Sequence, residues 1–399
     1  MDEPRFELAW TREEGAARAA LGFRQRFGTD PVGVWAAPGR VNIIGEHTDY
    51  NQGLCAPIAL PHCVYAAVAP SSDDTVRLAS AQSDGDGLWE LPMSEVRPGN
   101  VNGWGAYVAG TIWGMRQRLM PAPAISGYVD SCVPFGAGLS SSAALSCVFA
   151  VAEAALAGMP DSAGLRIRLV DAARDAENQI VGAPTGGLDQ SASLRSAKAH
   201  VLILDFQNNT ARQVPFNLAS SRLELLVIDT KAPHQLNDGQ YGARRASCEA
   251  AARKLGVASL REVDDLEQAM RVLGPDTVEG RRARHVITEI ARVKEFEQVA
   301  RQGSWEELGR LFQESHDSLR YDYEVTVPEL DVAVESALAA GAHAARMTGG
   351  GFGGSVIAVV PAERLQRVAN GVSAAFAQAG FAPPAFLLGT PSAPAARVV

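Results

Sequence analysis

Polar side chains that can exchange hydrogen bonds with a ligand are concentrated at residues 37–50, Ala-Pro-Gly-Arg-Val-Asn-Ile-Ile-Gly-Glu-His-Thr-Asp-Tyr. They are Arg40, Glu46, His47 and Asp49. Such a mixture of donors and acceptors suits a polyhydroxyl ligand, because each hydroxyl donates one bond and accepts others. The alternative is a solvated loop with salt bridges, but Ile43 and Ile44 lie among the charges and favour a buried segment.

A second segment, residues 133–145, reads Val-Pro-Phe-Gly-Ala-Gly-Leu-Ser-Ser-Ser-Ala-Ala-Leu. Gly136 and Gly138 permit backbone angles that other residues resist, and Ser140–Ser142 stand where a following helix would be N-capped. A helix N-terminus presents free N–H groups and the positive end of the helix dipole, so it attracts an anion. We interpret the segment as a phosphate-binding loop; the alternative is a capped turn without a ligand.

Carboxylates further along the chain are candidates for proton transfer and metal binding. Asp189 follows a Pro-Thr-Gly-Gly turn on an otherwise apolar segment. It is a candidate base or charge stabiliser, and the alternative is a helix N-cap. Asp171, Asp175 and Glu177 lie on one predicted helix, where most of them are expected to form a wet face. One of the three could reach a metal ion beside the phosphate loop.

A glycine-rich stretch and a tryptophan each allow two structural interpretations. The stretch at 347–355, Met-Thr-Gly-Gly-Gly-Phe-Gly-Gly-Ser, lets the backbone pass very close to another group, and it is either a tight functional turn or a flexible loop. Its place between a predicted helix and a strand at 356–360 favours the turn. Trp104 begins a predicted helix, where it is either part of the core or a platform for a flat base.

The elements that must position these residues follow from periodicity and from helix start and stop signals. The first half predicts helices at 11–27 (capped by Thr11 and stopped by Gly28), 104–117, 143–156 and 162–180. It predicts strands at 32–36, 64–68, 75–79, 125–129 and 201–206. After a strand at 223–229 the chain is mostly helical, with helices at 241–255, 259–273, 280–301 and 304–321. We place a domain boundary near residues 208–220, and the proline-rich tail is expected to be extended.

Composition narrows the class of protein. The chain has 399 residues and a formal net charge of −9, without a basic patch, so nucleic acid is not an expected partner. Neither an apolar signal core nor a membrane span is evident, and the cytoplasm is the expected location. The five cysteines are expected to be reduced and mostly buried. The histidines lack metal-ligand spacing, and six are left as structural or surface residues: His62, His200, His234, His285, His316 and His343.

Three stretches together resemble the GHMP small-molecule kinases, and among them the galactokinase family. They are Gly39–Tyr50, the loop Pro134–Ser142 and the glycine stretch Met347–Ser355. Residues 315–325 and 328–331 are also typical of galactokinases. The matches run in family order over nearly the whole chain. The phosphate loop indicates only the superfamily, whereas the first stretch carries the substrate class.

The resemblance implies an α+β fold of two domains with the active site between them. Residues 1–212 would form a ribosomal-S5-like α/β domain and residues 213–399 a ferredoxin-like α+β domain. The implied reaction transfers the γ-phosphoryl group of ATP to O1 of α-D-galactose, the first step of galactose breakdown by the Leloir route. The implied partners are ATP, D-galactose and Mg²⁺, without nucleic acid or membrane, and the chain is expected to be a monomer.

The resemblance also implies roles for individual residues. Asp189 would be the catalytic carboxylate, with Arg40 as its partner, stabilising charge on the transferring group. The sugar would be bound by Glu46, His47, Thr48, Asp49, Gly186 and Tyr241. ATP would be held by Trp104, Gly136, Ala137, Gly138, Leu139, Ser140, Ser141 and Ser142. Ser142 and Glu177 would hold Mg²⁺, which prefers hard oxygen ligands.

The sequence departs from the family pattern at two positions. Two functions other than the implied one are also considered. Gly187 replaces a bulkier residue in many relatives, and Phe135 stands at a position that is usually aliphatic, where only packing consequences are expected. The chain could phosphorylate a related sugar such as N-acetylgalactosamine or arabinose. It could also be a catalytically silent sugar sensor, which the intact Ser140–Ala144 run argues against.

Overall fold

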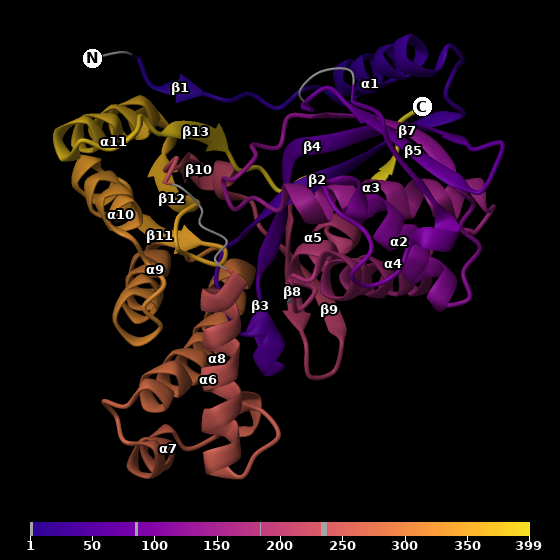
Figure 1. Cartoon of the computed structure of the whole chain (residues 1–399). Helices are drawn as coiled ribbons and strands as arrows, with labels where there is room; N and C mark the ends of the chain where they lie inside the picture. Colours follow the sequence, from indigo (N-terminus) through magenta and orange to yellow (C-terminus); the bar gives the residue numbers. More distant parts are fainter. Residues whose placement is uncertain (1–2, 84–86, 184, 233–237) are drawn as a thin grey trace.

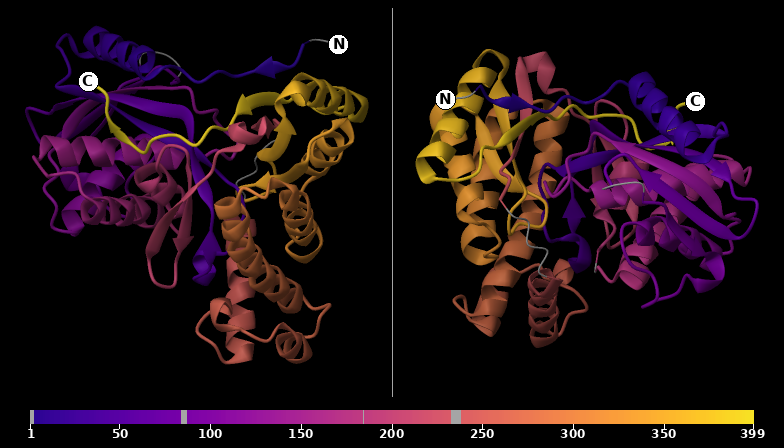
Figure 2. Two further views of the ribbon diagram at one scale, coloured as in Figure 1. Left: turned by 180° about the vertical axis from the view of Figure 1, so that it is seen from behind. Right: turned by 45° about the horizontal axis from the view of Figure 1, so that its top comes forward.

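The computed structural model describes residues 3–83, 87–183, 185–232 and 238–399. The chain forms two lobes that lie side by side, with a helical extension projecting below the C-terminal lobe (Figure 1). The same two lobes can be distinguished from behind and in a view with the top tilted forward (Figure 2). The two-domain α+β organisation expected from the sequence is confirmed.

The N-terminal lobe is built on a mixed sheet with the strand order β14-β2-β4-β7-β5-β6. Its strands are β2 (Gly33–Asn42), β4 (Pro57–Pro70), β5 (Thr75–Ser80), β6 (Trp89–Pro92), β7 (Ile125–Ser131) and β14 (Ala396–Arg397). Helices α1 (Arg12–Phe27), α2 (Gly105–Gln117), α3 (Ser141–Leu156), α4 (Ala163–Asp175) and α5 (Leu188–Arg195) surround it. A smaller sheet joins β3 (Leu54–Cys55), β8 (His200–Asp205) and β9 (Thr210–Pro215).

Strand β2 is buried along its whole length, because helices cover both faces of the sheet. Helix α1 packs on one face through Ala16, Ala19 and Phe23. On the other face α3 and α5 pack against β2. Helix α1 begins and ends as predicted: Thr11 accepts a hydrogen bond from the N–H of Glu14, and Gly28 closes the helix in the left-handed conformation.

The C-terminal lobe contains the sheet β1-β13-β10-β12-β11. Its strands are β1 (Arg5–Phe6), β10 (Leu223–Asp229), β11 (Ala344–Thr348), β12 (Ser355–Pro361) and β13 (Ala385–Leu388). Helices α9 (Leu308–Asp317), α10 (Pro328–Ala340) and α11 (Leu365–Ala379) pack against it. The order β13-β10-β12-β11 is the ferredoxin-like arrangement. Helices α6 (Asp238–Leu255), α7 (Leu266–Leu273) and α8 (Val278–Gln302) form the extension.

The two ends of the chain cross between the lobes. Strand β1 pairs with β13 in the C-terminal lobe, and β14 pairs with β2 in the N-terminal lobe (Figure 1). The expected division between residues 212 and 213 falls inside β9, which pairs with β8. The chain therefore passes from one lobe to the other between β9 and β10, and the boundary expected near residues 208–220 stays a prediction.

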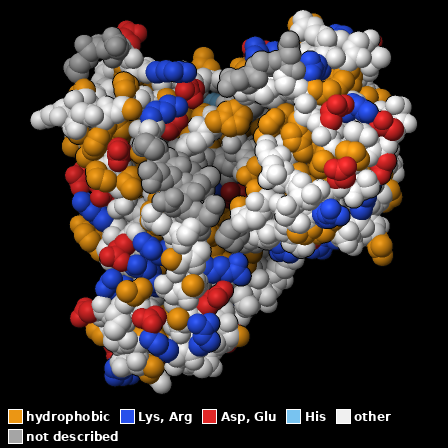
Figure 3. All heavy atoms as spheres, viewed as in Figure 1, with side chains coloured by type: hydrophobic (Ala, Val, Ile, Leu, Met, Phe, Trp, Pro, Cys, Tyr) orange, Lys and Arg blue, Asp and Glu red, His pale blue; other side chains and the backbone are white. Residues whose placement is uncertain are grey.

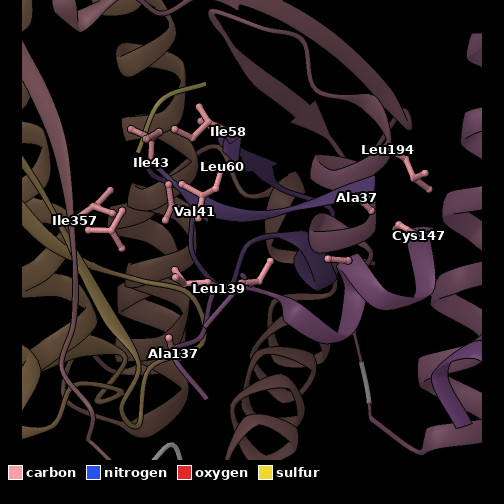
Figure 4. Packing of buried hydrophobic residues seen from close by; sticks show 14 of the residues in the cluster. Ala37, Val41, Ile43, Ile58, Leu60, Ala137, Leu139, Cys147, Leu194 and Ile357 are labelled. Atoms are coloured by element: carbon pink, nitrogen blue, oxygen red, sulfur yellow. The ribbon is translucent and has the colours of Figure 1, made fainter. Parts of the chain in front are cut away.

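Apolar residues from both lobes meet beneath the glycine–serine loop. Ala137 and Leu139 point into a buried cluster beside Val41 and Ile43 of the N-terminal lobe and Ile357 of β12 (Figure 4). All five of these side chains are at most 1% exposed. The loop is thus anchored by its apolar residues, which leaves its backbone and serines to face outward.

Several boundaries differ from the predictions. The predicted strand at 32–36 continues to Asn42 with a bulge between Pro38 and Arg40, so Arg40 lies on a strand and not in a loop. The predicted helix at 259–273 is wrong, because only 266–273 is α-helical, with Asp265 as its N-cap. The predicted helices at 162–180 and 304–321 both end in π-helical turns, at Ala176–Val181 and Ser318–Asp322.

Two further predictions concern the cysteines and the possibility of a membrane span. The five cysteines are free, and four of them are buried, as expected. Among the described residues no helix is long and apolar enough to cross a bilayer.

Candidate active site

A cavity of about 600 Å³ lies between the two lobes. Its lining comes from β2 and the loop after it, the glycine–serine loop, the first turn of α5, Tyr241 of α6 and the glycine stretch after β11. A hollow is visible at this junction on the molecular surface (Figure 3). The segments singled out in the sequence therefore meet in one place.

The glycine–serine loop turns sharply before α3. Gly136 and Gly138 adopt φ values of +71° and +69°, as the sequence predicted. Ser140 also adopts a left-handed φ of +60°, and its hydroxyl makes no cap bond to the helix. The expected N-capping serine is therefore wrong, because the Ser140 hydroxyl donates to Asp189 instead. The free N–H groups at the start of the 16-residue helix α3 are left for a ligand.

Asp189 lines the cavity and has two partners. Arg40 Nε donates to Oδ1 over 2.8 Å, with Nη2 of the same guanidinium 2.7 Å from that oxygen, and Ser140 Oγ donates to Oδ2. Asp189 is not a helix N-cap: Gly187 occupies that position with a φ of +99°, which favours glycine and accounts for the departure from the family pattern. The carboxylate is about a quarter exposed, toward the cavity.

Glu177 is the acidic residue of its predicted helix that reaches the site. The π-helical turn Ala176–Val181 carries it, and the carboxylate accepts hydrogen bonds from Gln190 over 2.8 Å and from the Ser142 hydroxyl. Burial, together with the nearby negative charge of Asp189, raises the pKa of Glu177 to about 7. Asp171 and Asp175 instead pair with Arg118 away from the cavity, as expected for a wet face.

Glu46 lines the cavity, but its carboxylate is held from behind. Arg346, which is fully buried on β11, donates to Glu46 Oε2. The N–H of Gly349 donates to Oε1 over 3.1 Å. A carboxylate has about four acceptor positions, so Glu46 retains lone pairs for a ligand hydroxyl.

The side chains of His47 and Thr48 are hydrogen-bonded to other groups of the protein, which the sequence did not indicate. His47 Nδ1 lies 2.9 Å from the Tyr50 hydroxyl, and Nε2 lies 3.2 Å from the carbonyl oxygen of Gly350. The Thr48 hydroxyl donates to the Leu54 carbonyl over 2.6 Å, and its side chain is completely buried. Thr48 does not line the cavity but closes the turn that carries Asp49, and its assignment to the sugar site stays a prediction.

Asp49, Gly186 and Tyr241 belong to the group of residues that the resemblance assigns to the sugar. Asp49 and Tyr241 line it, whereas Gly186 packs behind Asp49. A Cβ atom at position 186 would lie 2.1 Å from Asp49 Oδ2, so only glycine allows this approach. Burial raises the pKa of Asp49 to about 6, although the backbone N–H of Tyr50 donates to the carboxylate.

Aromatic side chains also line the cavity. Trp104 lies half-buried at the start of α2 and lines the cavity, as its ligand-binding alternative requires. Phe135 is 63% exposed and lines the cavity as well, so its ring is not packed in the core. Ser80, Gln82 and Ser83 also line the cavity and lacked any motif in the sequence.

Sequence reasoning missed the buried groups behind the site. Arg346, Glu289 and Tyr323 are completely buried and contact Glu46, Gly45 or Tyr50. The available signal for Arg346 was a lone charge inside the apolar strand before the glycine stretch. His285 and His316 are buried as well, and His234 lies outside the described residues.

Comparison with known proteins agrees with this geometry. Residues 22–70 match the galactokinase galactose-binding signature, 106–197 the GHMP kinase N-terminal domain and 293–378 the GHMP kinase C-terminal domain. The galactokinase of Streptomyces coelicolor is 45% identical over 382 residues, which cover 94% of this chain and 97% of that protein. This chain belongs to the galactokinase family. The galactokinase of Bos taurus is 39% identical, over 88% of this chain and 90% of its own length.

Solved structures extend the comparison. A galactokinase from Lactococcus lactis, complexed with galactose, superposes with a TM-score of 0.89 at 28% identity, over 95% of this chain and 98% of that chain. A mevalonate kinase from Methanococcus jannaschii has a TM-score of 0.63 at 15% identity, over 90% of this chain and 97% of that chain, and shows the shared fold alone. The chain therefore has the galactokinase fold within the GHMP superfamily and is an ATP-dependent sugar kinase by family.

Proposed function

We propose that the cavity binds ATP and α-D-galactose and transfers the γ-phosphoryl group to O1 of the sugar, giving galactose 1-phosphate and ADP. One observation carries the proposal. Asp189, paired with Arg40, contacts Ser140 of the phosphate loop and lines the same cavity as Asp49 and Tyr241. Phosphoryl transfer needs donor and acceptor held together with charge stabilisation beside them, and this set of groups supplies it.

ATP lies with its triphosphate along Gly136–Ser142 and its base near Trp104. The loop backbone and the first N–H groups of α3 face the cavity and favour an anion. Trp104 and the exposed ring of Phe135 supply flat apolar surfaces for the base or ribose.

Galactose lies against Asp49, Glu46 and Tyr241, with the Gly186 backbone behind. Carboxylates accept hydrogen bonds from sugar hydroxyls, and the Tyr241 ring forms an apolar wall beside them. The structural neighbour complexed with galactose supports galactose as a ligand of this fold.

Asp49 makes galactose binding dependent on pH. Because burial holds its pKa at about 6, the carboxylate takes up a proton as the pH falls through 6 and loses an acceptor for a sugar hydroxyl. We expect kcat/KM for galactose at saturating ATP to fall by about tenfold between pH 7 and pH 5. Asp49→Asn should be slow throughout and should lose the part of the pH dependence centred near 6, so that only the titration of Glu177, whose pKa is about 7, remains in this range. A variant that keeps the pH profile of the parent protein would exclude Asp49 as the titrating group.

Ser142 and Glu177 fit a magnesium ion. Their side chains are hydrogen-bonded to each other, and the buried carboxylate of Glu177 accepts its hydrogen bonds from the neutral side chains of Gln190 and Ser142. Among the described residues no three His, Cys, Asp or Glu side chains form a metal site of their own. Mg²⁺ accepts such a sparse protein site because it keeps waters and phosphate oxygens as further ligands. When bound, it would neutralise charge on the phosphates.

Glu177→Ala is expected to raise the Mg²⁺ concentration needed for half-maximal activity by at least about tenfold, a loss typical even of outer-shell partners. The cause is the loss of the only carboxylate proposed to hold the ion. Asp175→Ala, two residues away and paired with Arg118, is the matched control and should titrate like the parent protein. An unchanged Mg²⁺ titration for Glu177→Ala would assign the ion to other groups.

Asp189 accepts the O1 proton of the sugar, and Arg40 stabilises negative charge that develops on the transferring group. Arg40 is suited to this because it also donates from Nη1 to the Gly138 carbonyl, which links it to the phosphate loop. Every group in this account comes from a single chain, which supports a monomeric enzyme.

The proposal is tested by a coupled ADP-release assay over a panel of sugars. Galactose is expected to have the highest kcat/KM, ahead of N-acetylgalactosamine, arabinose and glucose. A preference for another member of the panel would assign the chain to a related sugar kinase. ATP binding without turnover of any aldose would indicate a sensor and overturn the proposal.

A further inference from the structure

The ring of His47 is held by two protein groups of different kinds. A carbonyl oxygen only accepts hydrogen bonds, so the contact between Nε2 and the Gly350 carbonyl requires the proton on Nε2. Burial lowers the pKa of His47 to about 3, so the ring is neutral and Nδ1 carries a lone pair. The Tyr50 hydroxyl, 2.9 Å away, must therefore donate to Nδ1.

Because each hydroxyl carries a single proton, the donors of the next two hydrogen bonds are determined as well. The Tyr50 proton is used on His47, so the Tyr323 hydroxyl donates to the Tyr50 oxygen over 2.8 Å. The Tyr323 proton is then used as well, so the Cys248 thiol donates to the Tyr323 oxygen over 3.1 Å. The result is a chain in one direction, from Cys248 through both tyrosines and His47 to the Gly350 carbonyl.

This chain connects the groups that surround the sugar end of the cavity. It begins on α6, which also carries Tyr241, and it ends on the glycine stretch that lines the cavity. The His47 ring lies 5.4 Å from the Tyr241 ring and 4.7 Å from that of Tyr323. His47 itself has a left-handed φ of +62°, a conformation that costs energy outside glycine and persists only where the surroundings hold it.

We propose that Tyr50, Tyr323 and Cys248 are positioning residues that fix His47 as its Nε2–H tautomer, so that His47 holds Gly350 and the Tyr241 ring in place and does not contact galactose through a ring nitrogen. This assignment rests on the proposed function. It replaces the role in direct sugar binding that the family resemblance implies for His47.

The first test is spectroscopic and needs no turnover. Nitrogen-15 NMR of histidine-labelled protein, with His47→Gln to assign the signal, reports which ring nitrogen carries the proton. We expect a neutral Nε2–H ring at pH 7 that is unchanged when galactose is added. An Nδ1–H ring, a charged ring or a tautomer change on galactose addition would overturn the proposal.

The second test is kinetic. Tyr50→Phe leaves Nδ1 without a donor and should raise KM for galactose about tenfold, with kcat and KM for ATP changed by less than about twofold. Tyr323→Phe, one step further away, should have a smaller effect, and the double variant should be no worse than Tyr50→Phe because the two act in series. Cys248→Ser keeps a donor and should match the parent protein, whereas Cys248→Ala should not.

Controls separate positioning from direct contact and from general damage. Tyr321→Phe, on the π-helical turn that ends just before Tyr323 but 62% exposed, should leave all parameters unchanged. With deoxygalactoses, Tyr50→Phe should lower kcat/KM by the same factor for each analogue. A penalty that disappears for one analogue alone would mean a direct contact with that hydroxyl and overturn the proposal. If the parent protein does not phosphorylate galactose, the proposed function fails, while the tautomer result still decides the hydrogen-bond chain.

Discussion

Replacing Asp189 by asparagine is expected to lower kcat by about 10²–10⁴-fold, the usual contribution of a positioned acid–base group. The substitution removes the negative charge and the ability to accept a proton, and it preserves size. Galactose affinity should change little, because the groups proposed to bind the other hydroxyls lie on separate elements. The expected signature is a loss in kcat without a comparable rise in the dissociation constant for galactose.

Asparagine at this position can satisfy the same hydrogen-bonding partners as aspartate. The asparagine oxygen can take the place of Oδ1 opposite Arg40, which donates from two nitrogens. The amide nitrogen then faces Ser140, whose hydroxyl can rotate from donor to acceptor. No buried hydrogen-bonding group loses its partner, so the fold should be retained.

Turnover is measured by ADP release and sugar binding by calorimetry. Asp171→Asn is the matched control, since Asp171 pairs with Arg118 and Arg174 outside the cavity and should be neutral to activity. Near-normal turnover of Asp189→Asn would remove this residue from the mechanism.

Arg346→Met is expected to lower the free energy of unfolding by about 3–5 kcal/mol, the cost typical of breaking a buried ion pair on one side. Arg346 is completely buried, donates to Glu46 and lies 3.6 Å from Glu289 Oε1. It also donates to the Ile43 carbonyl over 2.8 Å. Methionine fills a similar space but leaves Glu46 without its cation.

Chemical denaturation followed by both tryptophan fluorescence and circular dichroism measures this loss and checks that the transition is cooperative. Arg346→Met/Glu46→Gln should recover part of the stability, because it removes one unpaired buried charge. Arg301→Met, at an exposed pair with Glu297, should stay within about 0.5 kcal/mol of the parent protein. An Arg346→Met protein as stable as this control would show that the buried pair is not a stabilising contact.

Local signals in the sequence were sufficient for part of the fold. Helix α1 has its cap at Thr11 and its stop at Gly28, and both act within one turn of the helix. The left-handed turns at Gly136 and Gly138 are local in the same sense. By contrast, β1 and β14 are two residues long and are defined only by pairing with distant strands, so no periodic pattern could indicate that the chain ends cross between lobes.

The candidate site likewise contains residues that local motifs indicate and residues that no local motif indicates. The motifs located Arg40, Asp49, Glu177 and Asp189, which the fold brings to one cavity. They could not tell that the Thr48 side chain is buried outside the cavity lining, because its direction is set by a hydrogen bond to the Leu54 carbonyl across the turn. Residues behind the ligand contacts, such as Arg346 and Tyr323, act through partners far away in sequence, and no local spacing marks them.

Phosphorus NMR of a reaction mixture of this chain, MgATP and galactose reports both whether the phosphoryl group is transferred and to which oxygen of the sugar. We expect one new sugar phosphate, α-galactose 1-phosphate, formed in equal amount to ADP. Phosphate on another oxygen of the sugar, or ATP that binds and remains unchanged beside galactose, would contradict it.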